Sequence, residues 1–238
     1  MNKTNLIYEG KAKYILSTDN KNEIIVEYKD DATAFNGIKK ATIKNKGVLN
    51  NRITNIIFNY LIKNGIKTHL IKQLNERQQL CKKVDIFPLE FIVRNTVAGS
   101  MATKYGLEEG KVLTSPVLEI SYKKDELNDP LLNDYHALAI GIISREDLDK
   151  CYEQVIKINE LLKILFNKIG VTLIDFKVEF GKDNDGNIVL ADEFSPDNCR
   201  LWDSKTGKKL DKDVFRRDLG NIVDTYQIIL NKLEELNI

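Results

Sequence analysis

Charged and apolar side chains alternate along residues 173–181, in the order Leu-Ile-Asp-Phe-Lys-Val-Glu-Phe-Gly. On a β-strand, successive side chains point to opposite faces. Asp175, Lys177 and Glu179 are therefore expected to share one face, while the apolar side chains between them enter the core. A solvated outer face with an internal lysine–carboxylate pair would give the same pattern. This stretch alone does not separate a functional site from such a face.

The next predicted strand, residues 188–191, is followed by Asp192 and Glu193. A hairpin turn centred between Asp185 and Gly186 would place Glu179 opposite Asp192 and would point Glu193 to the other face. Like charges directly opposite each other destabilise a sheet, but a divalent cation between them would reverse the sign. Magnesium prefers oxygen ligands. Glu179 and Asp192 are therefore predicted to bind magnesium, with Lys177 beside them.

The loop at residues 192–203 is dense in polar side chains. Arg200 in this loop could bind a phosphate or a carboxylate through two parallel N–H bonds. Asp197 and Asp175 complete the predicted substrate-binding set. Cys199 has no histidine near it in the sequence, which favours a packing role over a catalytic thiol. An ordinary surface loop is the weaker alternative, because the carboxylates lie close by.

Two further segments have residues suited to binding anions. In the first, Arg94 ends an apolar stretch, and Gly99 and Ser100 then open a short helix. Backbone N–H groups at a helix start, with Ser100 and Arg94, can bind an anion, although Ser100 could also be only a helix cap. In the second, Lys11 and Lys13 flank Ala12 after a glycine. Such a turn can cover nucleotide phosphates, but two exposed lysines on an edge strand are the commoner case.

Composition narrows the class of protein. The chain has 238 residues, of which 36 are Lys or Arg and 35 are Asp or Glu, giving a net charge of +1. This balance argues against a general nucleic-acid binder. Three well-separated cysteines indicate a reducing, cytoplasmic setting. Neither a secretory leader nor a membrane-spanning run of about 20 apolar residues is expected. Walker, Rossmann, HExxH and GxSxG motifs are absent.

The predicted elements place these residues in a mixed α+β fold. An antiparallel meander is expected over residues 6–35, and helices over 46–63, 144–169 and 213–236. Strands are expected over 87–94, 173–180 and 188–191. The predicted boundary divides residues 1–84, an antiparallel sheet with a helix, from residues 85–238.

Taken together, these segments resemble those of the phosphoribosylaminoimidazole-succinocarboxamide synthase (SAICAR synthetase) family. The resemblance runs through nearly the whole chain, and residues 87–100 and 173–181 match the two segments that define the family. The other matching stretches are residues 8–13, 47–51, 192–203 and 213–216. Two long matches in the expected order make a chance agreement very unlikely.

The resemblance implies a function and a site. It implies two lobes, loosely like those of a kinase or an ATP-grasp enzyme, with ATP in the cleft between them. ATP would activate the carboxylate of carboxyaminoimidazole ribotide, L-aspartate would attack, and ADP and phosphate would leave. A homo-oligomer, with a dimer preferred, is also expected. The implied nucleotide contacts are Lys11, Ala12, Lys13, Lys82, Val84, Ile86 and Glu179.

The same resemblance assigns the remaining roles. The ribotide phosphate is expected to meet Arg94, Ser100 and Arg200, while Lys177 and Arg200 steady the transferring phosphoryl group. Some family members carry Asp where this chain has Asn36, so a charged role is not expected there. The alternatives are a small-molecule kinase of the same shape and a non-catalytic nucleotide-binding regulator.

Overall fold

The computed structural model describes residues 5–34 and 37–236. Its first part is an antiparallel five-stranded sheet with the order β1-β2-β3-β7-β6, which confirms the predicted meander. Asn36 lies outside the described residues. The strands are β1 (Leu6–Glu9), β2 (Lys13–Ser17), β3 (Glu23–Tyr28), β6 (Leu70–Gln73) and β7 (Gln78–Lys82). A separate hairpin is formed by β4 (Asp31–Ala34) and β5 (Lys39–Thr42).

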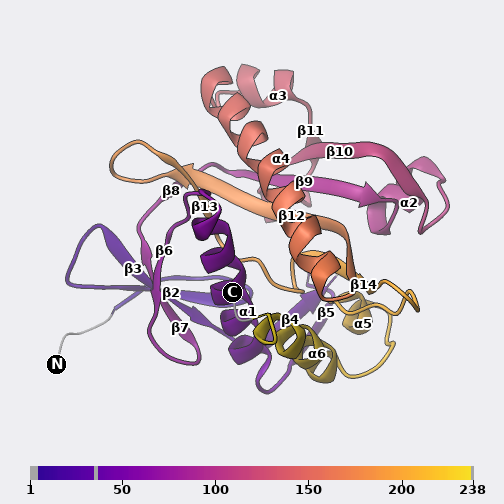
Figure 1. Ribbon diagram of the computed structural model, residues 1–238. Coiled ribbons are helices and arrows are strands. Elements are labelled where there is room, and N and C mark those ends of the chain that lie inside the picture. Colours follow the sequence, from indigo (N-terminus) through magenta and orange to yellow (C-terminus); the bar gives the residue numbers. More distant parts are fainter. Residues whose placement is uncertain (1–4, 35–36, 237–238) are drawn as a thin grey trace.

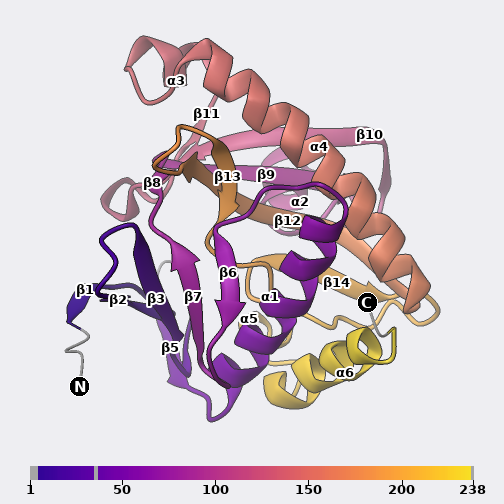
Figure 2. The ribbon, with the colours of Figure 1, turned by 60° about the vertical axis from the view of Figure 1, so that its left-hand side comes forward.

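Helix α1 (Lys46–Lys63) packs along this first sheet (Figure 2). Its bounds agree with the predicted helix. Ile53 and Ile57 on one face are completely buried. The chain then returns to the sheet through Gly65, whose φ of 82° is in the left-handed region that favours glycine.

The second sheet has seven strands, with the order β11-β10-β9-β12-β13 and with β8 and β14 also paired to β12. Strand β12 (Val171–Lys182) is its centre and carries the alternating charged row. The others are β8 (Asp85–Ile86), β9 (Leu89–Thr96), β10 (Val112–Tyr122), β11 (Leu131–Leu132), β13 (Ile188–Ala191) and β14 (Cys199–Asp203). Strand β12 thus places the charged row between neighbours on both sides.

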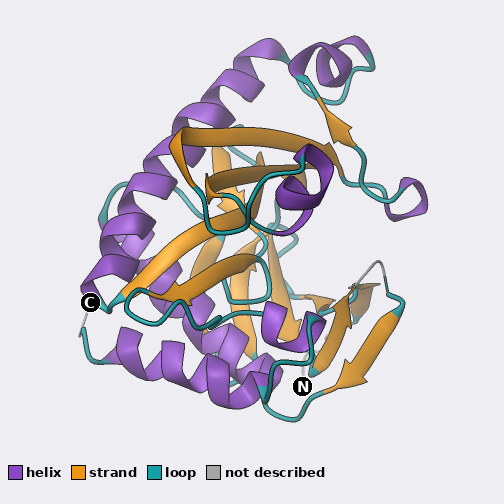
Figure 3. Cartoon of the chain, turned by 90° about the vertical axis from the view of Figure 1, so that its right-hand side faces the viewer, coloured by secondary structure: helices purple, strands orange, loops and turns teal. Residues whose placement is uncertain are grey.

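Helix α4 (Arg145–Lys168) packs across β12 (Figure 1). Ser144 caps it by accepting a hydrogen bond from the Asp147 N–H, as the capping pattern predicts. The shorter helices are α2 (Gly99–Tyr105), α3 (Asp134–Ala139) and α5 (Asp213–Arg216), with a single 3₁₀ turn at Asp125–Leu127. Figure 3 shows the long helices along the outer side of the strands.

The last predicted helix, 213–236, is in fact two helices, α5 and α6 (Ile222–Glu234). Asp218 and Gly220 between them have φ values of 54° and 147°, which an α-helix does not accommodate. Leu219, expected to face inward, is 55% exposed. Helix α6 packs against α1, so the end of the chain contacts the first sheet's helix.

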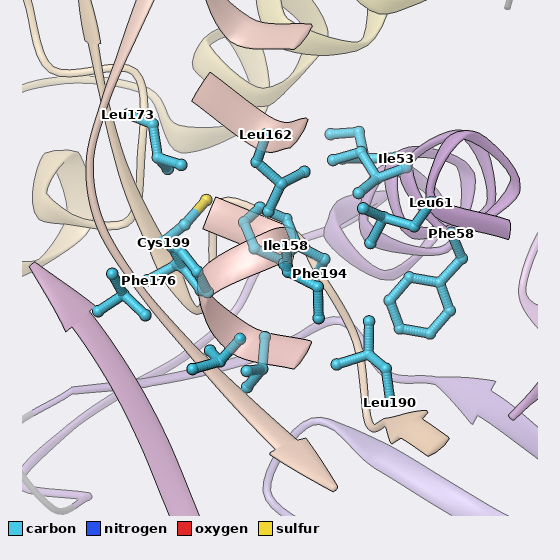
Figure 4. Packing of buried hydrophobic residues seen from close by; sticks show 14 of the residues in the cluster. Ile53, Phe58, Leu61, Ile158, Leu162, Leu173, Phe176, Leu190, Phe194 and Cys199 are labelled. Atoms are coloured by element: carbon cyan, nitrogen blue, oxygen red, sulfur yellow. The ribbon is translucent and has the colours of Figure 1, made fainter. Parts of the chain in front are cut away.

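One hydrophobic core joins both sheets. Ile158 and Leu162 of α4 lie in the same buried cluster as Ile53 and Phe58 of α1 (Figure 4). None of the helices in residues 5–34 and 37–236 is long and apolar enough to cross a membrane. The fold is α+β, as predicted, and the shared core fixes the face of β12 that carries the charged row relative to the first sheet.

Candidate active site

A cleft of about 660 Å³ is lined by residues from both sheets. Every site residue predicted from the sequence lines it. Ten of the described lining side chains are cationic and eight are anionic, so the cleft has an excess of positive charge and favours anionic ligands. The predicted residues that line it are Lys11, Ala12, Lys13, Lys82, Val84, Ile86, Arg94, Ser100, Asp175, Lys177, Glu179, Asp192, Asp197 and Arg200.

Glu179 and Asp192 lie in this cleft, and lysine side chains hold each of them. Lys123 and Lys177 both donate to Glu179, the latter at 3.2 Å from Nζ to Oε1. Lys13 donates to Asp192 Oδ1. Because Lys177 and Lys123 also interact electrostatically with Asp192, the two carboxylates share one group of lysines. The structure therefore brings together the pair that the sequence predicted.

The predicted register between β12 and β13 is wrong by one residue. Glu179 pairs with Ala191 rather than with Asp192. Asp192 follows β13 with a φ of 63°, and this left-handed backbone ends the alternation of faces. The prediction that Glu193 points to the opposite face is also wrong, because its carboxylate lies 3.0 Å from Lys13 Nζ and lines the same cleft.

Burial and neighbouring charges together set the protonation states of Asp192 and Lys177. Burial alone would raise the pKa of Asp192, but Lys13 and Lys177 hold it far below its usual value. Burial alone would lower the pKa of Lys177, but Glu179 and Glu90 raise it well above its usual value. Lys177 therefore stays charged at neutral pH and can stabilise negative charge, but it is a poor general base.

The residues present fit a magnesium ion whose coordination is only partly supplied by the protein. Glu179 and Asp192 supply carboxylate oxygens, which are the donors that magnesium prefers. Among the described residues, no group of three or more His, Cys, Asp or Glu is arranged as a metal cage. Water and substrate phosphates would therefore have to complete the coordination of a magnesium ion held by these two carboxylates.

A second cluster joins the two predicted arginines through one carboxylate. Asp175 Oδ2 accepts from Arg94 Nη1 at 3.2 Å and from Arg200 Nη1 at 2.8 Å. Arg94 Nη2 also donates to Ser100 Oγ at 3.1 Å. Gly99 has a φ of 52°, and an added Cβ there would overlap the Arg200 guanidinium. The glycine thus lets Arg200 lie against the start of α2, where Ser100 is also exposed to the cleft.

Asp197 lies between a lysine and a tyrosine of two helices. Its Oδ2 accepts from Lys46 Nζ at 2.6 Å, and its Oδ1 accepts from Tyr226 Oη at 2.6 Å. Lys46 is completely buried. Because a buried pair of this kind loses several kcal/mol when one partner is removed, Asp197 has a structural role in addition to lining the cleft.

The glycine-lysine turn, residues 10–13, and the linker between the two sheets, residues 82–86, also line the cleft. Lys11 reaches Asp125 at 2.6 Å, whereas Lys13 reaches Asp192, so the two lysines engage different carboxylates instead of standing side by side. The linker packs closely on β12, because an added Cβ at Gly181 of β12 would fall 2.6 Å from the linker's Val84 Cγ1. Only a glycine in β12 lets the linker lie this close to the charged row.

Several residues that line the cleft or support it were missed by sequence reasoning. Most of them share a signal that only tertiary structure reveals, namely a charged side chain whose partner is distant in sequence. Lys123 bonds Glu179 across 56 residues, and Lys46 bonds Asp197 across 151. The segment 213–216 was noted as part of the resemblance without roles for its residues. The missed residues are Lys46, Glu90, Lys123, Asp125, Glu193, Lys212, Asp213 and Arg216.

His69 supports the position of Asp192. The backbone N–H of His69 donates to the Leu190 carbonyl at 2.8 Å, and the His69 ring interacts with the Asp192 backbone. Burial lowers the pKa of His69 to about 4. Below pH 6.5 the unfolded chain therefore binds a proton that the folded chain refuses, so this residue destabilises the fold progressively from pH 6.5 down to about 4.

We expect His69→Gln to remove this loss, which amounts to about 3 kcal/mol. Urea unfolding gives the free energy of unfolding of each protein at pH 7.5 and pH 4.5. The loss due to His69 is the fall in this free energy between the two pH values in wild type minus the fall in the variant. The comparison is needed because burial raises the pKa of Asp211 to about 7, which acts with the opposite sign in both proteins. An identical pH dependence in the two proteins would contradict the prediction.

The fold and the site together define an enzyme that gathers several anionic substrates beside two buried carboxylates. The sequence profile of the SAICAR synthetase family matches residues 6–233. A phosphoribosylaminoimidazole-succinocarboxamide synthase from Clostridium botulinum (strain Alaska E43 / Type E3) is 60% identical over 235 residues, which is 99% of this chain and 100% of the relative.

Solved structures agree with the family match. The synthase from Ehrlichia chaffeensis superposes with a TM-score of 0.95 at 45% identity, over 97% of this chain and 98% of the other. A SAICAR synthetase in complex with ADP superposes with a TM-score of 0.92 at 49% identity, over 95% and 96%. The chain belongs to the SAICAR synthetase family. It is an ATP-dependent ligase of purine biosynthesis that uses aspartate.

Proposed function

We propose that one cleft binds ATP, magnesium and carboxyaminoimidazole ribotide in adjoining subsites and there ligates L-aspartate to the ribotide. The observation that carries this proposal is the division of the cleft into two charged groups. One is built around Glu179, Asp192 and their lysines, and the other around Arg94 and Arg200. Two separate groups of cations suit two separate anionic substrates.

The first group is assigned to the nucleotide. Lys11 and Lys13 lie on the turn that would cover the ATP phosphates, and the linker at Lys82, Val84 and Ile86 would contact adenine. The related structure that holds ADP supports a nucleotide here. Glu179 and Asp192 would hold magnesium, which when bound neutralises phosphate charge. Lys13 and Lys123, which now bond these carboxylates, would turn toward phosphate oxygens.

The second group is assigned to the ribotide. Ser100, Arg94 and Arg200 would bind its phosphate, and Asp175 orients both guanidinium groups. Arg200 bonds Asp175 and Asp213 rather than either metal-binding carboxylate. We therefore assign Lys177, which bonds Glu179, to the transferring phosphoryl group, and we assign Arg200 to the ribotide phosphate.

The chemistry follows in two steps. An oxygen of the ribotide carboxylate attacks the γ-phosphorus of ATP, ADP leaves, and the charged Lys177 stabilises the transferring group. The amine of L-aspartate then attacks the acyl carbon, phosphate leaves, and the amine loses its proton. Exclusion of water from the cleft protects the acyl phosphate between the two steps.

The phosphate pocket is tested with two variants of different expected stability. Ser100→Ala removes one hydrogen bond to Arg94, so the fold should be kept while the KM for the ribotide rises several-fold. Arg94→Ala removes the partner of Glu119. It should raise the ribotide KM by about ten- to a hundred-fold, and it should cost about 3–5 kcal/mol of stability.

Steady-state kinetics with each substrate varied in turn, together with urea unfolding, measures both effects. The KM for ATP should change little in either variant. If the KM for ATP rises while the KM for the ribotide does not, the two subsites have been assigned the wrong way round.

We further propose that residues 1–84 and 85–238 act as two lobes with ATP bound between them, and that the enzyme is a cytoplasmic homodimer. The exposed apolar edge strand β1, in which Leu6 and Ile7 are each 56% exposed, supports self-association, because such an edge can pair with another chain. Light scattering tests the dimer, and a monomer at micromolar concentration would reject it.

A further inference from the structure

Lys212 is a cation whose charge the protein leaves poorly compensated. Its side chain lines the cleft and is only 12% exposed. Its one ion-pair partner among the described residues is Asp197, at 3.6 Å from Nζ to Oδ2, which is too long for a hydrogen bond. Burial lowers the pKa of Lys212, more than Asp197 raises it. An ammonium group with three donors and no acceptor within hydrogen-bond distance is available to a ligand that enters the cleft.

Asp197 compensates Lys212 only in part, because each of its oxygens already accepts from a closer donor than Lys212. Lys46 donates to Oδ2 and Tyr226 donates to Oδ1, both at 2.6 Å. Two lysines therefore share one carboxylate, and the closer of the two is the completely buried Lys46. The unmet partner of Lys212 has to come from the cleft.

Arg216 is a second cation with unused donors on the same wall. Its Nη1 donates to Asp213 Oδ1 at 2.6 Å, which is its single hydrogen bond within the described part of the chain. A guanidinium has five N–H donors, so four remain. Arg216 lines the cleft, and Lys212 interacts electrostatically with it. The two side chains thus form a pair of cations that are ready for two acceptors.

The identity of the ligand follows by elimination, given the proposed function. Lys11, Lys13 and the metal-binding carboxylates are assigned to ATP. Ser100, Arg94 and Arg200 are assigned to the ribotide phosphate. The remaining substrate is L-aspartate, and its two carboxylates have no assigned partner, whereas the ribotide carboxylate reacts with the γ-phosphoryl group beside Lys177.

We propose that Lys212 and Arg216 bind the two carboxylates of L-aspartate. Their location fits the chemistry, because Lys212 also interacts electrostatically with Glu193, which bonds Lys13 at 3.0 Å on the nucleotide side. On the other side, Asp213 bonds both Arg216 and Arg200. Aspartate held here lies between the phosphoryl donor and the ribotide, where its amine can reach the activated carboxyl carbon.

The test compares Lys212→Met and Arg216→Gln with Arg217→Gln as the matched control. Arg217 is the next residue in the chain, but it bonds Glu109 at 3.0 Å outside the cleft lining. Loss of one charged contact should raise the KM for L-aspartate by about ten- to a hundred-fold in each cleft variant. The KM values for ATP and the ribotide should stay within about two-fold of wild type by the same reasoning.

A second readout uses L-asparagine, which lacks one carboxylate. Wild type should prefer aspartate strongly, and at least one of the two cleft variants should lose about ten-fold or more of that preference, because a missing ionic contact no longer distinguishes the two amino acids. The control should keep the preference. Arg216→Gln also serves if Lys212→Met does not fold, because Arg216 is the more exposed side chain.

Three outcomes separate this inference from the function it rests on. A higher KM for aspartate alone, with lost discrimination, supports it. An unchanged aspartate KM, or a rise confined to the ribotide KM, overturns it while wild-type ligation still stands. Absence of ligated product in wild type, with ATP, magnesium and both substrates present, would overturn the proposed function instead.

Discussion

Asp192→Asn is expected to lose about a hundred-fold of turnover while the fold stays intact. The change removes one negative oxygen from a proposed magnesium site, where metal binding is worth several kcal/mol of charge stabilisation. The backbone at Asp192 has a φ of 63°, and asparagine tolerates this region well. Lys13 keeps an ionic partner in Glu193 at 3.0 Å. The substitution therefore tests charge and not backbone geometry.

The measurement is the rate at several magnesium concentrations, and the variant should need far more magnesium than wild type. Asp125→Asn is the matched control. Asp125 also lines the cleft and bonds Lys11, but its side chain is 65% exposed, so its removal should change the rate little. Near-normal activity of Asp192→Asn at limiting magnesium would contradict the assignment of this carboxylate.

The sequence predicted the parts of the site that local periodicity controls. The period-two alternation along β12 placed Asp175, Lys177 and Glu179 on one face, and all three line the cleft. The helix at α1 followed from apolar spacing that a buried face requires. These predictions succeeded because each rests on neighbours within a single element.

The predictions that failed rest on backbone conformation just beyond an element. The left-handed residue after β13 moved Glu193 to the cleft face, and a hairpin turn centred on Asp185 shifted the register by one. Alternation cannot indicate where a strand stops. In the same way, the positive φ values at Asp218 and Gly220 divide the last helix, although apolar residues continue at helical spacing across the break.

Long-range pairing accounts for the residues that sequence reasoning missed. Lys46 opens a helix and looks like an ordinary solvated lysine, yet the fold buries it completely against Asp197. Lys123 follows the end of β10 in a polar stretch and becomes functional only because β12 brings Glu179 to it. A single sequence gives no signal for such pairs, since each lysine is unremarkable in its own segment even where its partner was predicted.

The proposed mechanism couples ATP cleavage to amide formation within one cleft. If the acyl phosphate forms in a water-excluded site, it should persist until an amine attacks it. If the aspartate amine is held beside the activated carbon as proposed, its attack is effectively unimolecular. We therefore expect ADP release to be slow with ATP, magnesium and ribotide alone. Addition of L-aspartate should accelerate it by on the order of a hundred-fold or more.

The direct test is an ADP-release assay with mass analysis of the products, run with and without L-aspartate. One amide-linked product should appear for each ADP released, and only when aspartate is present. A small-molecule kinase of the same fold would use the same magnesium carboxylates and lysines but would need no amine. Full-rate ADP release without aspartate, with accumulation of a stable phosphorylated ribotide, would contradict the ligase mechanism and favour the kinase.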